Sequence, residues 1–374
     1  MNDPIYLDYA ASTPVDKDVL RELLPYFTEL YANPSNSINS AGQKAFDAVK
    51  KSEQQIQEAL NTSDYNVIFT SGATESINTC LKSLYTQFGF KKHQIITCKT
   101  EHKAVLSVCE YLEQMGAEII YLPVDKNGNV SLEDLKKSIS EKTLAVSLMY
   151  VNNETGVIHD IQAISEICQI SNVSFVCDAT QAVGKLPLDL NDTSIDYLIF
   201  SGHKIYAPKG IGVLLINKKA KQLPLIHGGG QQNNLRSGTL NVPGIVALGK
   251  AVEKSCKEAP LEYTRTRILR DQFETALAKT GKIKIIAEQA NRSPYISNIQ
   301  FLFNDSEEII LPLRDKIFFS TGSACTSAIV EPSHVLTAMD IENHLAEKCL
   351  RFSFGAPTTQ EEIATTINHF INIL

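Results

Sequence analysis

Hydrophobic residues between about positions 66 and 216 form short continuous runs that alternate with longer amphipathic stretches. Seven of these runs predict strands: NVIFT, QIITC, EIIYL, TLAVSLMYV, VSFVC, DYLIF and GVLLI. Helical periodicity fills the intervals between the earlier runs, as in Glu75–Phe88 and Lys103–Met115. Continuous apolar strands that are separated by helices predict an α/β domain with a mostly parallel seven-stranded sheet covered on both faces.

A second block follows these strands. A long helical stretch, roughly Val242–Thr280, leads to strands near Ile296–Phe303 and Arg351–Phe354 and to further helices. The 374 residues are enough for two domains, each with its own core. We predict a large domain and a smaller α+β domain, formed by 16–259 and by 1–15 with 260–374.

Composition and charge narrow the range of partners. The formal charge of −7 and the pI near 5.7 argue against direct, phosphate-driven binding of nucleic acid. No apolar run reaches the roughly 18 residues needed to span a bilayer. The start, MNDPIYLDYAAST, has neither a basic flank nor a cleavable apolar segment, so we expect a cytoplasmic protein. The eight cysteines form no C-x-x-C pair, and we expect most to be small buried residues and not metal ligands.

Two polar residues after neighbouring strands predict the chemistry of the site. Asp178 ends VSFVC, and Lys204 follows the next run within the tetrapeptide SGHK. Such a pair can hold pyridoxal 5'-phosphate: the lysine forms an imine, and the aspartate keeps the ring nitrogen protonated so that the ring is an electron sink. Ser201 and His203 are phosphate-binding types, and Gln181 can reach the phenolic oxygen of the cofactor. Taken alone, Asp178 also fits a helix N-cap, and Lys204 a solvated loop charge.

Other strand ends carry polar residues too. The run SGATE follows NVIFT and opens a helix, whose free N–H groups and Thr74 hydroxyl suit a phosphate; by itself it also matches a capping box. His102 follows QIITC, where an imidazole can stack on the pyridine ring and move protons, or have a structural role. Asn152 and Asn153 follow AVSLMYV and can bind the cofactor or substrate, or form a turn.

The C-terminal block adds a thiol and a guanidinium group. Cys325 lies in STGSACTSA, a run of small polar residues typical of a mobile, exposed loop. An exposed thiol with a lowered pKa is nucleophilic, and an incidental surface cysteine is the alternative. Arg351, in CLRFSFG, can clamp an α-carboxylate through two hydrogen bonds or form an ordinary ion pair.

Seven motifs in register resemble those of the cysteine desulfurases, pyridoxal-phosphate enzymes of the NifS/IscS type. They are FTSGATES, EHKAV, VNNETG, DATQAVGKLP, SGHKIYAPKGIG, LRSGTLNV and STGSACTSA. The resemblance extends from YLDYAASTPVD to LRFSFG and covers nearly the whole chain. It implies the fold-type I transferase fold, and the extended cysteine loop at about 318–332 resembles that of the group I branch.

The resemblance also implies how pyridoxal 5'-phosphate is held. Lys204 bonds to it covalently, His102 stacks on its ring, Asp178 pairs with the ring nitrogen, and Gln181 bonds the phenolic oxygen with Asn153 nearby. The phosphate is held by Ala73, Thr74, Ser201, His203 and Thr239. The last of these reaches the phosphate from the partner subunit, which implies a homodimer.

The implied substrate is L-cysteine. Arg351, Asn153 and Asn33 bind its carboxylate, and His102 is the acid–base partner of its thiol. Cys325 takes the sulfur as a persulfide and L-alanine is left. The sulfur then passes to an acceptor protein, with iron–sulfur cluster assembly, tRNA thiolation and DNA phosphorothioation all open. Selenocysteine lyase, or another pyridoxal-phosphate enzyme of this family, is the alternative activity.

Two features depart from the family pattern. Asn39 stands where the family commonly has a histidine, which puts a role of that histidine in substrate access in doubt. The sequence also ends at Leu374, before the segment with which housekeeping members dock the iron–sulfur scaffold. We therefore expect a dedicated acceptor.

Overall fold

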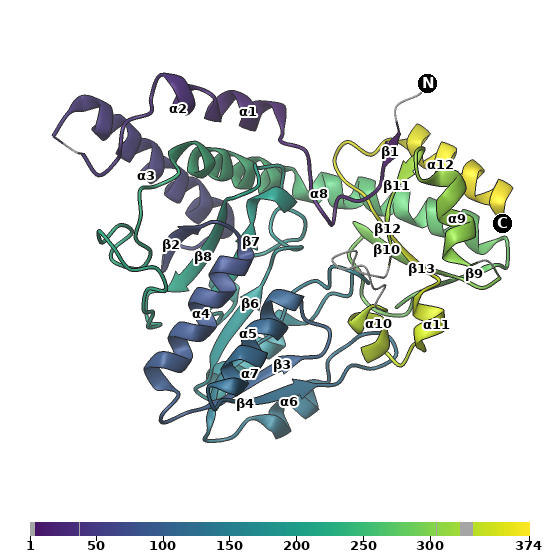
Figure 1. The fold of residues 1–374 in the computed structure, drawn as a ribbon, viewed down its shortest axis with the longest axis horizontal. Coiled ribbons are helices and arrows are strands. Elements are labelled where there is room, and N and C mark those ends of the chain that lie inside the picture. Colours follow the sequence, from purple (N-terminus) through teal and green to yellow (C-terminus); the bar gives the residue numbers. More distant parts are fainter. Residues whose placement is uncertain (1–3, 37, 304, 322–331) are drawn as a thin grey trace.

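A seven-stranded sheet is the largest element of the computed structural model, which describes residues 4–36, 38–303, 305–321 and 332–374 (Figure 1). The strands are, in spatial order, β2 (Tyr65–Thr70), β8 (Gly212–Asn217), β7 (Tyr197–Ser201), β6 (Ser174–Asp178), β5 (Thr143–Ser147), β3 (Gln94–Cys98) and β4 (Glu118–Leu122). Strand β8 runs antiparallel to both of its neighbours, and the other adjacent pairs are parallel. The predicted, mostly parallel sheet of these seven apolar runs is confirmed.

Helices cover both faces of this sheet, which explains why its strands are apolar throughout. The helices on one face are α4 (Ala73–Phe88) and α5 (Lys103–Gln114), and those on the other are α3 (Ser40–Leu60), α7 (Ile161–Ile170) and the start of α8 (Val242–Ala278). In β8, Leu214 packs in the core with α4 and α5, and its neighbour Val213 packs in the core on the opposite face. This alternation follows from the pleat of the strand.

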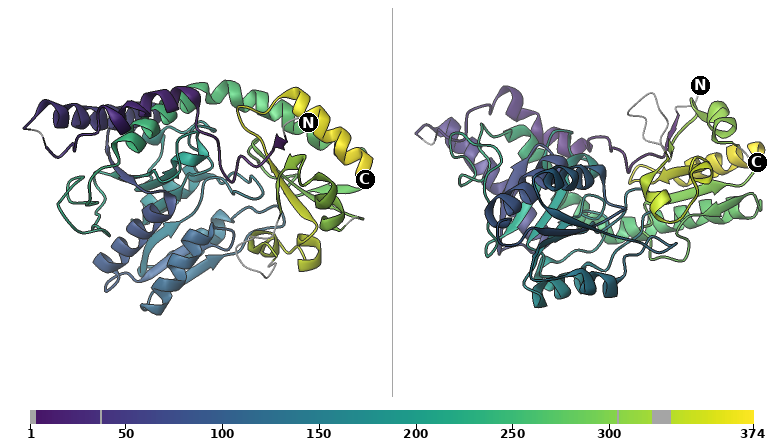
Figure 2. Two further views of the ribbon diagram at one scale, coloured as in Figure 1. Left: turned by 45° about the horizontal axis from the view of Figure 1, so that its top comes forward. Right: turned by 60° about the horizontal axis from the view of Figure 1, so that its bottom comes forward.

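A second, smaller block contains both ends of the described chain (Figure 2). Its antiparallel sheet has, in order, β12 (Ser320–Thr321), β13 (Cys349–Ser353), β10 (Ile296–Phe301) and β9 (Ile283–Ile285). Nearby, β1 (Ile5–Tyr6) pairs in parallel with β11 (Ile317–Phe318). Phe273, Phe352 and Phe370 pack edge to face in the core of this block, together with apolar residues of α9 (Ser306–Leu313) and α12 (Gln360–Ile373). The first strand, β1, is therefore held by its pairing with β11 in the second block.

Helix α8 joins the two blocks (Figure 1). Its first part packs on α3 and α1 (Lys17–Leu23), and its later part packs on α12, β9 and β10. The predicted domain boundary near 260 falls inside this helix, so the division at that position stays a proposal. Short helices complete the fold: α2 (Pro25–Thr28), α6 (Leu132–Ser138), α10 (His334–Ala338) and α11 (Asn343–Ala346).

The described cysteines are mostly core residues. All of them are buried except Cys256, which is partly exposed on α8, whereas Cys325 lies outside the described residues. Within the described ranges, none of the helices combines the length and the hydrophobicity that a membrane span requires.

Candidate active site

A cavity of about 580 Å³ lies where strands of the large sheet reach their carboxyl ends. Its volume is within the range of about 300–1,000 Å³ that is typical of ligand and cofactor sites. The predicted site residues that line it are Ala73, Thr74, His102, Asn153, Asp178, Gln181, Ser201, His203, Lys204 and Arg351. The sheet thus brings these predicted residues together at the edge where open α/β sheets bind ligands.

Lys204 lies in a single turn of 3-10 helix (Gly202–Lys204) directly after β7. Its Nζ donates hydrogen bonds to the carbonyl oxygens of Ala10 and Ala11, each 2.6 Å away. Burial and then the positive charge of Arg351 lower the pKa of Lys204 to about 8. A neutral amine, the form that attacks an aldehyde, is therefore accessible close to neutral pH.

Asp178 is the last residue of β6 and is buried. Its Oδ1 accepts a hydrogen bond of 2.9 Å from the N–H of Thr180, so the carboxylate shapes the turn after the strand while it also lines the cavity. Gln181 follows in the same turn, and its Nε2 donates to the Ala10 carbonyl at 2.9 Å. No helix directly follows Asp178 in the described structure, so the carboxylate orders a turn at the edge of the cavity and is not a helix N-cap.

The start of α4 offers unpaired N–H groups to the cavity. Its N-cap residue is Gly72, at φ +153°, and no side chain caps the helix. Glu75 accepts a hydrogen bond from the N–H of Ser71, at 2.8 Å, but no reciprocal side-chain bond completes a capping box. Ala73 and Thr74 line the cavity at this end, so the geometry favours an anion site over the capping box considered from the sequence.

His203 faces the same region. Its Nδ1 is buried and has no hydrogen-bond partner among the described residues. Burial, followed by the charges of Lys204 and two further lysines, lowers the pKa of His203 to about 4. An unpartnered ring nitrogen of this kind can bind a polar group of a ligand, since burying it without a hydrogen bond is costly.

His102 is the N-cap of α5 and lines the cavity. Its Nδ1 accepts a hydrogen bond of 3.1 Å from the N–H of Ala104. In the neutral ring the proton is therefore on Nε2. Desolvation lowers the pKa of His102, against the attraction of the Asp178 carboxylate. The imidazole is thus neutral over more of the physiological pH range and can exchange a proton through Nε2.

Arg351 reaches the cavity from β13 in the smaller block. One of its terminal nitrogens is 2.7 Å from Oδ1 of Asp8, and the other donates to the carbonyl of Asn153 at 3.0 Å. The guanidinium Nε is buried and has no partner in the described structure. The ion pair considered from the sequence therefore exists, and an N–H group remains for a ligand.

Four residues that the sequence singled out are not among the described residues that line this cavity: Asn33, Asn152, Thr239 and Cys325. Asn33 is not among its lining residues, because its side chain accepts a hydrogen bond from the N–H of Ser35, at 2.9 Å, in its own turn. Thr239 is exposed on a loop and does not line the cavity of its own chain. Asn152 is the turn former, with its amide bonded to backbone groups of that turn. Cys325 lies outside the described residues.

The structure also places residues at the site that the sequence reasoning missed. Asp8 pairs with Arg351, and the carbonyl groups of Ala10 and Ala11 accept from Lys204. Lys185 lies behind Gln181 and is buried. Two patterns in the sequence could have indicated these residues. Asp8, Ala10 and Ala11 all lie in the YLDYAAS motif, and Lys185 follows Gln181 by four positions. Asn39, at the position where the family commonly has a histidine, is the N-cap of α3. Its Oδ1 accepts a hydrogen bond from the N–H of Gly42.

The donor set fits pyridoxal 5'-phosphate. An uncapped helix start and the unpartnered His203 nitrogen suit the phosphate, Lys204 suits the aldehyde, and Asp178 suits the ring nitrogen. Together with a fold of helices on both faces of a mostly parallel sheet, this cavity defines the chain as a pyridoxal-phosphate-dependent enzyme of fold type I.

Comparison with known proteins gives the family. The chain belongs to the aminotransferase class-V family, whose model matches residues 5–365. The cysteine desulfurase IscS of Rickettsia prowazekii (strain Madrid E) is 42% identical over 98% of this chain and 90% of that protein. A NifS-like protein of known structure superimposes with a TM-score of 0.92 at 35% identity, over 99% of this chain and 100% of that one. SspA in complex with cysteine gives a TM-score of 0.84 at 34% identity, over 94% of this chain and 98% of that one. Within the family, the chain is one of the cysteine desulfurases, which depend on pyridoxal 5'-phosphate.

Proposed function

We propose that the chain removes sulfur from L-cysteine, leaving L-alanine and a persulfide on Cys325. The observation that carries this proposal is the meeting of three side chains in one cavity: Asp178 from the end of β6, Lys204 from the turn after β7, and Arg351 from β13. A lysine of lowered pKa, a buried carboxylate and a guanidinium with a spare N–H are what a cofactor-linked amino-acid substrate requires.

The bound cofactor supplies one kind of chemistry, the withdrawal of electrons from the substrate carbons that are joined to it. Lys204 would hold it covalently, and its neutral Nζ would serve as the base for the α-proton of the substrate. Asp178 keeps a proton on the ring nitrogen through its charge. Arg351 and Asn153 hold the substrate carboxylate, which fixes the side of the substrate that faces Lys204.

Sulfur transfer is then a displacement at the substrate sulfur. The Cys325 thiolate forms a new sulfur–sulfur bond, the substrate carbon–sulfur bond breaks, and its electron pair goes to the carbon. That carbon takes a proton and leaves as part of alanine, so one thiol is converted to one persulfide. His102, with a proton available on Nε2, exchanges a proton with the substrate thiol.

Two variants test the proposal with matched controls. We expect Lys204→Ala to lose the visible absorption of the bound cofactor after dialysis, whereas Lys254→Ala, which removes a lysine from α8, retains it. Cys325→Ser should retain the colour and form neither persulfide nor alanine. Cys256→Ser is the matched thiol control and should be active. Normal alanine output from Cys325→Ser would refute the role of that cysteine.

We further propose a homodimer. Thr239 is exposed on a loop and is not among the described residues that line the cavity of its own chain. In the same loop, Arg236 forms an ion pair of 2.9 Å with Glu75, which lines the cavity at its phosphate end. Large apolar side chains are exposed nearby in sequence and at α2, with Phe27 62% exposed. Mixing inactive Thr239→Asp and Lys204→Ala subunits should restore one complete site in each mixed dimer. Failure to restore activity in verified mixed dimers would contradict the shared site.

The persulfide is proposed to pass to an acceptor protein, in iron–sulfur cluster assembly, tRNA thiolation or DNA phosphorothioation. The unpaired state of the described cysteines supports a reducing, cytoplasmic location. Capture of partners with the persulfide-loaded wild type, and not with Cys325→Ser, identifies the acceptor.

A further inference from the structure

Lys185 is a buried lysine next to the cavity, and it has no role in the mechanism described above. It is only 8% exposed, and its Nζ is 2.8 Å from Oε1 of Gln181. No carboxylate of the described residues lies within ion-pair distance of it. The ring of Tyr295 lies 5.9 Å from Nζ. Burying a lysine without a counter-ion is unfavourable, so this position calls for a specific explanation.

The side-chain amide of Gln181 is fixed at both of its ends. Its Nε2 faces the Ala10 carbonyl, which can only accept a hydrogen bond, at 2.9 Å. Its Oε1 faces Lys185, whose Nζ donates a hydrogen bond to it at 2.8 Å. Both contacts select the same orientation, with the NH₂ group on the cavity side. One N–H is used by Ala10, and the second has no acceptor among the described residues.

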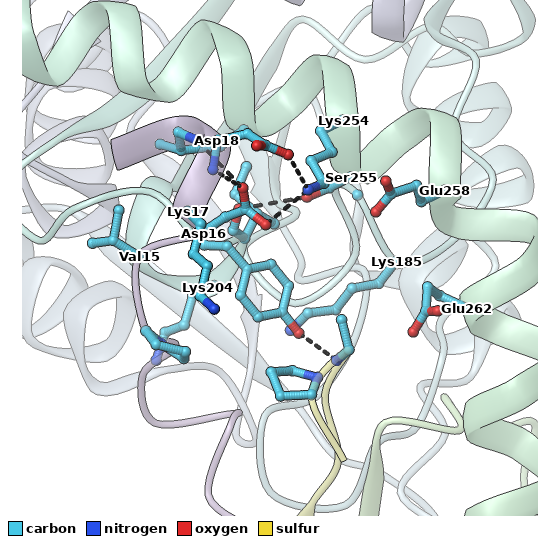
Figure 3. Close-up of a pocket in the computed structure, with 18 of the residues that line it drawn as sticks. Val15, Asp16, Lys17, Asp18, Lys185, Lys204, Lys254, Ser255, Glu258 and Glu262 are labelled. Carbon is cyan, nitrogen blue, oxygen red and sulfur yellow. Dashed lines mark hydrogen bonds and ion pairs between the residues drawn. The ribbon is translucent and has the colours of Figure 1, made fainter. Parts of the chain in front are cut away.

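A pocket on the other side of Lys185 shows that this lysine has alternatives to Gln181. The pocket has a volume of about 500 Å³ and is lined by Lys185, Lys204, Glu258 and Glu262, among others (Figure 3). The two glutamates come from α8, and neither forms an ion pair with Lys185. Lys185 thus points to an amide oxygen although carboxylates line the same pocket. Burial, followed by the charges of Lys204 and Arg351, lowers its pKa to about 7.

We infer that Lys185 is a positioning residue, which holds the Gln181 amide so that its free N–H points at the phenolic oxygen of the bound cofactor. This inference rests on the proposed function, because it needs pyridoxal 5'-phosphate in the cavity. Without the lysine, only the Ala10 carbonyl still selects this orientation, so the amide turns over more readily and presents its oxygen, which would repel the phenolic oxygen. Lys185 follows Gln181 by four positions in the same turn, and the hydrogen bond between them links the two side chains.

The effect is measurable without turnover. A donor on the phenolic oxygen competes for the proton that this oxygen shares with the Lys204 nitrogen, so it lowers the pH at which that nitrogen loses its proton. Loss of one hydrogen bond, worth about 1 kcal/mol, corresponds to about 0.7 of a pH unit. We therefore expect Lys185→Met to raise the midpoint of the pH titration of the visible band by about 0.7 unit.

A double-variant cycle separates positioning from simple charge removal. Lys185→Met, Gln181→Met and the combined variant are titrated by absorption, and cofactor retention on dialysis is measured for each. In the Gln181→Met background the lysine change should have no further effect, because the amide it holds is gone. Lys185→Arg, which keeps the donors, should titrate like the wild type. Lys254→Met removes a charge from the same pocket and should leave the midpoint unchanged.

Each outcome is decisive. An equal shift from Lys185→Met in both backgrounds shows a charge effect and overturns the inference, as does no shift in either. If Lys185→Met does not fold, Lys185→Leu, which also has no donor, takes its place in the same cycle. A wild-type protein that retains no cofactor overturns the proposed function, and the inference with it. A coloured wild type with additive shifts overturns the inference alone.

Discussion

Arg351 and Asp8 should set the pH range in which Lys204 captures the cofactor. Burial and the Arg351 charge lower the pKa of Lys204 from its ordinary 10.5 to about 8, whereas Asp8 acts in the opposite direction. At pH 7 an amine of pKa 8 is about 9% neutral, and one of pKa 10.5 is about 0.03% neutral. The lowered value therefore makes the reactive form roughly 300 times more abundant at pH 7.

The assay follows the growth of the visible band when the cofactor-free protein is mixed with excess pyridoxal 5'-phosphate at a series of pH values. The rate should rise with pH and level off above about 8, since capture needs the neutral amine. Arg351→Leu removes the positive charge and should move the midpoint to higher pH. Asp8→Asn removes the negative charge and should move it to lower pH.

A small lysine analogue, titrated in parallel, corrects for protonation of the cofactor itself. The opposite signs of the two shifts are the critical result, because a general loosening of the site would move both variants the same way. Midpoints that coincide for the wild type and both variants, or that shift in one direction, would refute the electrostatic explanation.

Three further outcomes concern stability and are checked by urea unfolding. Burial opposes ionisation of Glu75, but hydrogen bonds from Arg236 and Ser71 outweigh it and lower the pKa of Glu75. Glu75→Gln should therefore lower the free energy of unfolding by about 1.5–3 kcal/mol near neutral pH. This cost should disappear as the pH falls below the ordinary value of 4.5, because the pairing stabilises only the charged carboxylate. Arg292→Leu should cost about 3–5 kcal/mol, because it leaves the buried Glu274 carboxylate, now 2.8 Å from the guanidinium, without its partner. Gly212→Ala should cost about 1–3 kcal/mol and weaken cofactor retention, because the new methyl group would lie 2.6 Å from the Cα of the glycine that caps α4.

Each of these outcomes has a control. Glu253→Gln breaks an exposed ion pair with Lys250 and should change stability by less than about 1 kcal/mol. Replacing both Arg292 and Glu274 by leucine should recover much of the loss, since no buried charge is left unpaired. Wild-type cofactor retention in Gly212→Ala would show that the start of α4 does not hold the phosphate.

The sequence predicts the parts of the site that sit at strand ends. Asp178, Lys204 and His102 are polar residues that interrupt apolar runs, and the carboxyl ends of parallel strands lie at a common edge. The strands of the large sheet are apolar along their whole length because both of their faces are buried. The sheet can therefore be predicted from these continuous apolar runs. The run TLAVSLMYV is an exception, because β5 ends at Ser147, where the chain turns toward the Asn152 turn.

Other contacts leave no local trace in the sequence. Asp8 and Arg351 are 343 positions apart, and neither hydrophobic period nor spacing encodes their pairing. The carbonyl groups that receive Lys204 belong to alanines, whose side chains give no sign of this role. Helix α8 continues through Pro260, which sequence rules place at a helix break, because packing on both blocks supports it.

The presence of both chain ends in the smaller block has a consequence for synthesis on the ribosome. During translation, Asp8, Asp178 and Lys204 are all synthesised before Arg351. The ion pair between Asp8 and Arg351 can therefore form only late in synthesis. The complete cavity can therefore form only after β13 has been translated, so the site is among the last parts of the molecule to be assembled.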